Sequence, residues 1–242
     1  MPLEKKVRFL SIILCQKSLF VQLSNAVNLK RVGRPRKSET LKRRDHLLEQ
    51  SFHLFATHGY GALSLETIAR EARVSLRTIY SQFGGKAGLF RAAICQYSDQ
   101  FVGALPEAGL PRDQPLGKGL QAFGEQYLYQ VLRPELVSLR SQVSAEAHRF
   151  PELAREFYEM GPGRSLGYLS QFLRTYQKSG VIGNIDTDFV AGEFLNMLKG
   201  ELYQRVQLGL DPTPSRETIA VWTSRVVSLF LSGCLKCSES SE

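Results

Sequence analysis

A short segment that ends at Phe83 carries side chains able to hydrogen bond to a nucleic acid. In this segment the apolar Ile79 is surrounded by residues with hydroxyl, guanidinium or amide groups and by the apolar Leu76. These residues are Ser75, Leu76, Arg77, Thr78, Tyr80, Ser81 and Gln82. An Arg guanidinium can donate two hydrogen bonds to a guanine, and a Thr can contact a thymine methyl group. The segment therefore predicts base and phosphate recognition by a helix that Ile79 anchors in a core.

Two short helices joined by a tight turn are expected to position these side chains. Ser64 is a natural N-cap for a helix over 65–72, and Ser75 is a natural N-cap for a helix over 76–83. The dipeptide Arg73-Val74 supplies the turn. This layout is that of a helix-turn-helix, whose second helix enters the major groove of DNA. Two short helices of an ordinary bundle would share the pattern, so this alternative stays open here.

Longer helices are expected on both sides of the helix-turn-helix. The segment 39–57 has apolar residues at helical spacing on one face, namely Leu41, Leu48, Phe52 and Phe55. Gly59 occupies the position expected of a C-terminal glycine. After Gly84-Gly85, a longer helix is expected to begin at Lys86 and to run to about residue 103.

The rest of the chain is predicted to be helical as well. Pro and Gly separate five expected helices, near 115–132, 135–149, 152–178, 187–209 and 215–233. The tripeptide Gly161-Pro162-Gly163 should kink or split the third of them. Because no segment alternates with a period of two, the predicted fold class is all-α.

Basic residues are concentrated in the first third of the chain. Residues 1–92 hold 17 Lys and Arg against 6 Asp and Glu, whereas the whole chain has a net charge of +8. This asymmetry indicates a polyanionic partner at one end, either nucleic acid or acidic lipid, although a solvated basic surface would look the same. Residues 30–38 are predicted to form a flexible arm. Its Arg34 and Arg36 would either enter a narrow minor groove or add only non-specific attraction.

The other reactive residues do not form a recognisable catalytic or metal site. The four cysteines are too few and too scattered for a disulfide framework, which favours a reducing cytosol and a cytoplasmic protein; they are Cys15, Cys95, Cys234 and Cys237. The last two form an isolated CxxC without further ligands nearby. Three histidines of the N-terminal third are interpreted as structural or surface groups, namely His46, His53 and His58. The sequence lacks a glycine-rich phosphate loop, a nucleophile elbow and an HExxH motif. We therefore expect no enzyme activity, no cofactor and no metal.

No membrane span is expected, because no run of apolar residues reaches about 18. The stretch Phe9–Cys15 follows basic residues as in a signal peptide, but Gln16 and Lys17 interrupt it and no small-residue cleavage site follows. We interpret residues 1–28 as a surface helix or as a segment upstream of the start codon used in the cell.

The order of residues over 42–102 resembles the DNA-binding domain of the TetR/AcrR family. The matching positions are Gly59-Tyr60, the run from Leu65 to Ala69, the run from Val74 to Phe83, Lys86 and Leu89-Phe90. The resemblance implies a three-helix head, joined by a connecting helix to an all-α ligand-binding and dimerisation domain. It also implies that Tyr80 and Lys86 contact phosphates and that Arg77 and Thr78 face the groove.

Two further features bear on this resemblance. The segment from Glu146 to Arg155, with Phe157-Tyr158 and Gly161-Pro162 after it, is similar to the AefR-like C-terminal group of AcrR-type regulators. By contrast, Gly84-Gly85 stand where the family often has proline and a serine or aspartate, and Gly88 replaces a better helix former. These glycines should loosen the start of the connecting helix, by about 1 kcal/mol for an interior glycine.

The last two predicted helices have more apolar surface than one packing face requires. Helix 187–209 has little polar face, and helix 215–233 adds a small-residue stripe to its apolar face, namely Ser224, Ser228 and Ser232. We expect these helices to pack against a twin subunit through Phe194, Leu198, Leu202, Trp222, Val226 and Leu229. A large monomeric core is the alternative.

A small-molecule pocket is expected among the middle helices, as the family resemblance implies. Its predicted lining is aromatic with a few polar groups, which suits an apolar ligand; the residues are Phe101, Phe123, Tyr127, His148, Met160, Tyr168 and Phe172. An aromatic stripe at helical spacing more often marks a plain core, which is the alternative here, and His148 could instead satisfy a core hydrogen bond.

These predictions divide the chain into an N-terminal extension with a basic arm (1–38), a helix-turn-helix domain (39–92), a ligand-binding and dimerisation domain (104–235) and a tail (236–242). The predicted function is a ligand-responsive repressor, a homodimer on palindromic double-stranded DNA. The predicted DNA contacts are Arg34, Arg36, Ser64, Thr67, Ser75, Leu76, Arg77, Thr78, Tyr80, Ser81 and Lys86. The alternatives are an activator, a non-specific architectural DNA-binding protein and, least favoured, an enzyme built on helices.

Overall fold

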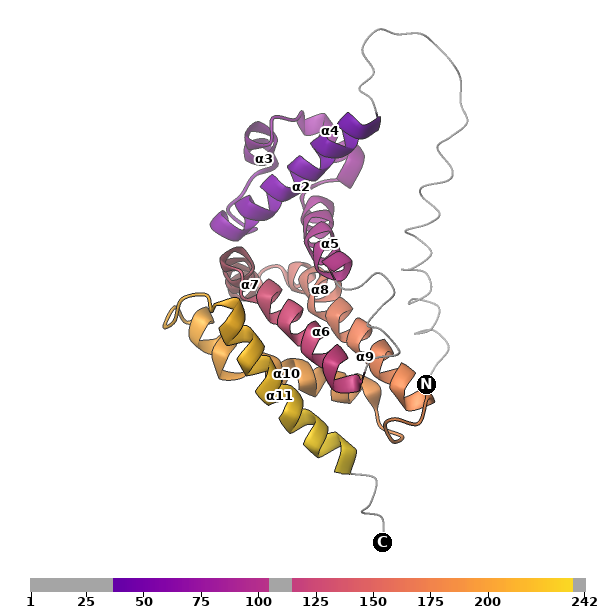
Figure 1. Cartoon of the computed structure of the whole chain (residues 1–242). Coiled ribbons are helices and arrows are strands. Elements are labelled where there is room, and N and C mark those ends of the chain that lie inside the picture. The colour runs from indigo at the N-terminus through magenta and orange to yellow at the C-terminus, as the bar shows by residue number, and fades with distance from the viewer. Residues whose placement is uncertain (1–36, 105–114, 237–242) are drawn as a thin grey trace, which may run out of the picture. The chain divides into compact units, whose positions relative to one another are not determined.

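The computed structural model describes residues 37–104 and 115–236, and within these residues every regular element is a helix (Figure 1). The all-α prediction is therefore confirmed. In chain order the helices are α2 (Lys37–His58), α3 (Leu65–Glu71), α4 (Leu76–Phe83), α5 (Lys86–Ala104), α6 (Leu116–Val131), α7 (Pro134–Glu146), α8 (Pro151–Met160), α9 (Pro162–Lys178), α10 (Thr187–Gln207) and α11 (Arg216–Lys236). The described residues from Leu41 onwards form one compact unit, and all packing described below lies within it.

Local capping determines where the short helices α3 and α4 begin. The Ser64 side chain accepts a hydrogen bond from the backbone N–H of Thr67 at 3.1 Å. Ser75 accepts one from the backbone N–H of Thr78, also at 3.1 Å. Both serines thus satisfy a backbone donor that the first turn of a helix leaves free, as the sequence predicts.

Glycines end helices α2 and α4. Gly59 has φ +79° after α2, and Gly84 has φ +75° after α4, in the left-handed region that favours glycine. Gly88, in the first turn of α5, has a different reason. A Cβ atom there would lie 1.9 Å from the carbonyl oxygen of Phe83, so the end of α4 approaches α5 too closely for a side chain.

The core of the N-terminal helices continues into the C-terminal half of the chain. Its fully buried members include Phe55, Ile68, Ile79 and Phe90, and residues of α7 and α8 join the same cluster. The prediction for Leu41 is wrong, because its side chain is 51% exposed. Residues 41–46 of α2 are exposed, and buried positions follow from Leu47 onwards.

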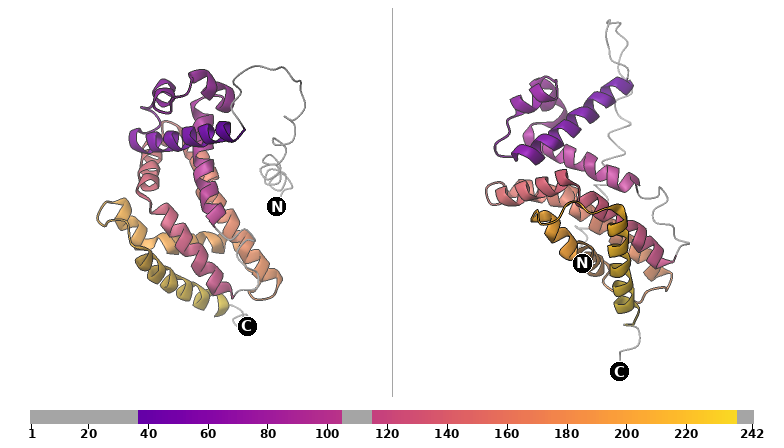
Figure 2. Two further views of the ribbon diagram at one scale, coloured as in Figure 1. Left: turned by 45° about the horizontal axis from the view of Figure 1, so that its top comes forward. Right: turned by 60° about the vertical axis from the view of Figure 1, so that its left-hand side comes forward.

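Helix α5 connects the two halves. Figures 1 and 2 show it running from α2, α3 and α4 towards the other helices, and it packs against α4, α6 and α8. In the C-terminal half, α6 packs against α11 and α9 against α10. The expected break near Gly161 is confirmed, since this residue separates α8 from α9. A second break was not predicted: Gly200 has φ 40° and ψ −145° and interrupts α10.

The apolar residues predicted for a dimer interface are mostly used within the subunit. Phe194 and Leu198 are fully buried, because α6, α9 and α11 all pack against α10. Val226 is buried as well. Trp222 is half-buried and its indole N–H donates to the Leu198 carbonyl at 2.7 Å. Phe194, Leu198 and Val226 were wrongly assigned to an outer face, whereas Trp222 and Leu202 are half-buried and Leu229 is 66% exposed.

Within the described residues, no helix is long and apolar enough to cross a membrane. The basic arm with Arg34 and Arg36, the segment 1–28 and Cys237 lie outside the described residues. The described residues include no group of three or more His, Cys, Asp or Glu side chains that could hold a metal ion.

Candidate nucleic-acid interface and internal cavity

Helix α4 presents polar side chains to solvent while one apolar residue holds it in place. Ile79 is fully buried, whereas Tyr80 is 55% exposed. The other exposed side chains of this segment are Ser75, Arg77, Ser81 and Gln82, and Leu76 and Thr78 are half-buried. Because a helix of this length anchored on one side projects its other side outwards, the predicted recognition residues are available to a partner.

The hydroxyl groups of this interface are already engaged in the protein. Ser75 and Thr78 hydroxyls are 2.7 Å apart, and Ser81 donates to the Thr78 carbonyl at 3.1 Å. Ser64 and Thr67 form a similar pair at the start of α3, at 3.2 Å. These hydroxyl groups therefore have partners within the protein whether or not they also contact DNA.

Arg77 differs from the hydroxyl residues. Among the residues that the structure describes, its guanidinium group makes no hydrogen bond or ion pair, and its side chain is exposed. A guanidinium group without a partner keeps all five N–H donors for a ligand. The geometry thus makes Arg77 the side chain of α4 best able to read a base edge.

Lys86, at the start of α5, lies against an aromatic cluster. Its Nζ is 4.4 Å from the centre of the Tyr60 ring, which in turn packs against Phe55, Phe90 and Phe150. Burial lowers the pKa of Lys86, and the nearby Glu146 carboxylate opposes this change. The ammonium group has three N–H donors, so those that do not face the Tyr60 ring are available for a phosphate contact.

Helix α7 holds the N-terminal helices through hydrogen bonds that the sequence did not reveal. The backbone N–H of Gly61 donates to both carboxylate oxygens of Glu146, at 3.0 and 2.9 Å. The Ser138 hydroxyl donates to the Ala56 carbonyl at 2.6 Å. These partners are more than 80 residues apart in the chain, so no local pattern could indicate them.

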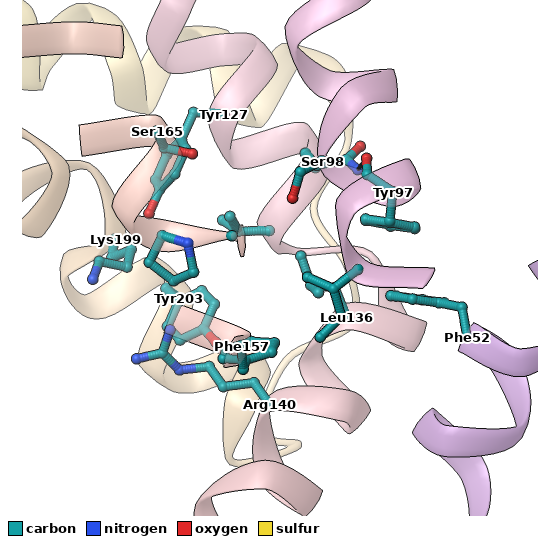
Figure 3. A pocket seen from close by; sticks show the side chains of 15 residues that line it. Phe52, Tyr97, Ser98, Tyr127, Leu136, Arg140, Phe157, Ser165, Lys199 and Tyr203 are labelled. Atoms are coloured by element: carbon teal, nitrogen blue, oxygen red, sulfur yellow. Dashed lines mark hydrogen bonds between the residues drawn. The ribbon is translucent and has the colours of Figure 1, made fainter. Parts of the chain in front are cut away.

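An internal cavity of about 60 Å³ lies where seven helices meet (Figure 3). Most of its lining comes from α5, α6, α7, α9 and α10, and Phe52 of α2 reaches it too. The full lining is Phe52, Ile94, Tyr97, Ser98, Tyr127, Gln130, Val131, Leu136, Arg140, Phe157, Gly161, Pro162, Ser165, Lys199 and Tyr203.

The predicted pocket residues correspond to this cavity only at Tyr127. Phe123, Phe172 and Met160 are buried in the two hydrophobic cores, and Tyr168 stacks on Phe123 with ring centres 5.9 Å apart. These residues fill space instead of enclosing it, so the plain-core alternative applies to them. His148 is exposed beyond the end of α7, which excludes both roles considered for it. The side chain of Phe101 lies outside the described residues.

The polar groups of the cavity include two cations. Figure 3 shows Arg140, Lys199 and Tyr203 on one side of the cavity, and Phe52, Leu136 and Tyr97 on the other. The Arg140 guanidinium carbon is 5.7 Å from the centre of the Tyr203 ring. Burial lowers the pKa of Lys199, and the positive charge of Arg140 lowers it further. Burial also raises the pKa of Tyr127 and Tyr203.

Comparison with protein families agrees with this division into two regions. A model of the TetR family of bacterial regulatory proteins matches residues 47–93. A model of the C-terminal domain of AefR-like transcriptional repressors matches residues 118–233. The chain belongs to the TetR family.

Individual relatives support the same assignment. The Flavonoid-responsive Regulator FrrA is 30% identical in sequence, with a TM-score of 0.67 over 80% of this chain and 97% of FrrA. A TetR-family regulator from Mesorhizobium loti, 23% identical, shares the fold with a TM-score of 0.67 over 82% of this chain and 98% of its own.

A curated relative matches over a shorter stretch. The HTH-type transcriptional repressor ComR of Escherichia coli (strain K12) is 38% identical over 70 residues, or 29% of this chain, and the match spans only 31% of ComR. Taken with the family models, these likenesses identify the chain as a DNA-binding transcriptional regulator of the TetR family.

Proposed function

We propose that this TetR-family protein is a ligand-responsive repressor that binds a palindromic operator as a homodimer. The observation that carries the proposal is the cavity, because its wall includes Phe52 of α2 as well as residues of the C-terminal half. A molecule in the cavity would touch the first helix of the DNA-binding head directly. Only a ligand that binds two conformations with different affinity can shift the balance between them, and this contact gives the ligand a means to do so.

The hydrogen bonds from α7 support a route for the same response. Arg140 lines the cavity, and the same helix holds Ala56 through Ser138 and Gly61 through Glu146. A ligand that moves α7 would therefore move the end of α2 and the loop after it. The names of relatives fit this proposal, since FrrA is called flavonoid-responsive and ComR is called a repressor.

The exposed face of α11 supports the homodimer. Val221 and Leu229 are 51% and 66% exposed, and the serine stripe lies beside them, with Ser224, Ser228 and Ser232 all exposed. Small side chains allow a second helix to approach closely. A two-fold dimer would place two copies of α4 on successive major grooves of a palindromic site.

DNA binding by the purified chain tests the proposal. Fluorescence anisotropy would compare DNA from upstream of the protein's own gene with shuffled DNA of equal length and composition. We expect a preference of about a thousandfold or more for the operator, which a regulator maintains as salt is raised. Equal affinity for both DNAs, falling equally with salt, would instead favour an architectural protein.

The subunit interface is tested separately. Light scattering after size exclusion should give twice the chain mass for the wild type and a single chain mass for Leu229→Glu. Leu208→Glu, an equally exposed leucine between α10 and α11, is the matched control and should stay dimeric. A reporter gene under the operator then separates repression from activation.

A further inference from the structure

The cavity contains positive charge without a compensating negative charge. Arg140 and Lys199 both line it, and none of its lining residues is an Asp or a Glu. Within the described residues, neither cation forms a salt bridge. The charge that acts most on Lys199 is that of Arg140, which repels it.

Both cations are half-buried, so the arrangement becomes more favourable when an anion enters. Removing a cation from water costs free energy unless the cation is paired, and two cations near the same space repel one another as well. A carboxylate would reverse both effects, since an Arg guanidinium forms charge-assisted hydrogen bonds with it. The neighbouring phenol and hydroxyl groups of Tyr127, Ser165 and Tyr203 supply additional polar atoms to the same cavity.

The remaining wall determines the body of the ligand. Away from the cations the wall is formed by Phe52, Leu136 and Tyr97 (Figure 3), and Phe157 adds a third Phe or Tyr ring. The free space of about 60 Å³ is several times what one water molecule needs, yet too small for a long acyl chain. Flat apolar groups of limited size therefore fit this part of the cavity.

We propose that the cavity binds a small aromatic carboxylate, with its carboxylate at Arg140 and Lys199 and its ring between the apolar walls. This inference rests on the proposed ligand-responsive function, since it names the chemical class of the effector. A carboxylate on one aromatic ring combines the charge that the cations lack with the size that the cavity allows.

Calorimetric titration of the full chain with four probes of one ring each tests the proposal. Benzoate is the anion, benzamide and benzyl alcohol are neutral, and benzylamine is a cation of similar size. We expect benzoate to bind at least about tenfold more tightly than benzamide, and benzylamine not to bind. Acetate and inorganic phosphate, which lack the ring, should bind at least about tenfold more weakly than benzoate.

Two charge-removing variants locate the anion. Arg140→Gln and Lys199→Gln should each lower benzoate affinity about tenfold and leave benzamide affinity unchanged. Arg155→Gln and Lys178→Gln are the matched controls, because both side chains are exposed and away from the cavity lining. Circular dichroism shows which variants fold; if neither cavity variant folds, the probe series on the wild type decides.

Several outcomes would overturn the proposal. These are benzamide or benzylamine binding as tightly as benzoate, phosphate binding as tightly as benzoate, no binding of any probe, or unchanged benzoate affinity in both folded cavity variants. The operator titration on the same samples separates this inference from the proposed function. Benzoate binding without operator preference would refute the regulator, whereas operator preference without a preference for benzoate would refute only the anion site.

Discussion

The two proposed recognition regions of this chain, helix α4 and the cavity, differ in what they contain before a partner binds. Helix α4 exposes Arg77 and Tyr80 to water, where an unpaired guanidinium group costs nothing. The cavity wall instead contains Arg140 and Lys199, which are both half-buried, and burial lowers the pKa of Lys199. The charge on α4 is therefore stable without DNA, whereas a ligand of opposite charge would stabilise the two cations of the cavity.

The two regions also differ in how they are built. The start and the end of α4 depend on neighbours within a few residues, namely the Ser75 cap and the Gly84 stop. The cavity is assembled from seven helices between residues 52 and 203. A change in one local contact should therefore disturb the first region alone, whereas the second depends on the packing of the whole chain. The predictions below test this distinction.

The largest effect is expected at the junction between α4 and α5. In Gly88→Ala the new Cβ would lie 1.9 Å from the Phe83 carbonyl oxygen, so one of the two helices must move. We expect the free energy of unfolding to fall by about 3 kcal/mol, the upper end of the usual cost of overpacking. Urea denaturation measures this loss.

Gly183→Ala is the matched control, because its Cβ would meet nothing within 4 Å. This variant should change stability by less than about 0.5 kcal/mol. Helix propensity alone predicts the opposite sign for Gly88→Ala, a gain of about 1 kcal/mol. A more stable Gly88→Ala protein would thus contradict the close approach and favour the loose junction that the sequence suggested.

Gly88 also marks the limit of what the sequence could predict. The caps at Ser64 and Ser75 and the stop at Gly84 were predictable, because each acts on backbone groups within the next few residues. The reason for Gly88 was not, since it depends on where the chain folds back after two glycines. Gly200 is a similar case: its unusual backbone lies where a Cβ would be 3.0 Å from the Trp222 ring, a neighbour from another helix.

The sequence predicts a pocket, but of the residues that it predicts only Tyr127 lines the cavity. Aromatic side chains at helical spacing were the basis of that prediction, yet Phe123 and Phe172 fill the core. The residues that give the cavity its chemistry, Arg140 and Lys199, have no distinctive local pattern. Whether a lysine on a helix faces water or a cavity depends on the helices packed around it. These helices are distant in the sequence, so no local pattern predicts the packing.

The second largest effect concerns base recognition. Arg77→Ala should reduce operator affinity by about 2 kcal/mol and weaken the preference for the correct base. Affinity for shuffled DNA should change far less, and the unfolding free energy should stay the same because the guanidinium group makes no hydrogen bond or ion pair within the described residues. Anisotropy titrations with both DNAs measure this. Arg155→Ala removes an exposed arginine of α8 as the control, and an equal loss on both DNAs would reduce Arg77 to a non-specific contact.

A smaller effect is expected at the cap of α4. Ser75→Ala removes the acceptor of the Thr78 backbone N–H and should cost about 1 kcal/mol of stability. Because the cap also orients α4, operator affinity should fall while benzoate affinity does not change. Ser228→Ala, at an exposed position of α11, serves as the control for stability. A fall in benzoate affinity in Ser75→Ala would show that the two regions are not built independently.

The smallest change in stability is expected where the two regions meet. Glu146→Gln keeps one oxygen that can accept from the Gly61 N–H but loses the charge and the second hydrogen bond, so we expect a cost of about 0.5 kcal/mol. This variant also tests the coupling between operator binding and ligand binding. Substitutions between two coupled sites change their coupling by about 0.5–2 kcal/mol without touching either ligand. Operator affinity with and without saturating benzoate should therefore differ less in Glu146→Gln than in the wild type, and Glu159→Gln, an exposed carboxylate of α8, should behave as the wild type. An unchanged difference in Glu146→Gln would mean that the ligand signal reaches α2 through Phe52 and not through α7.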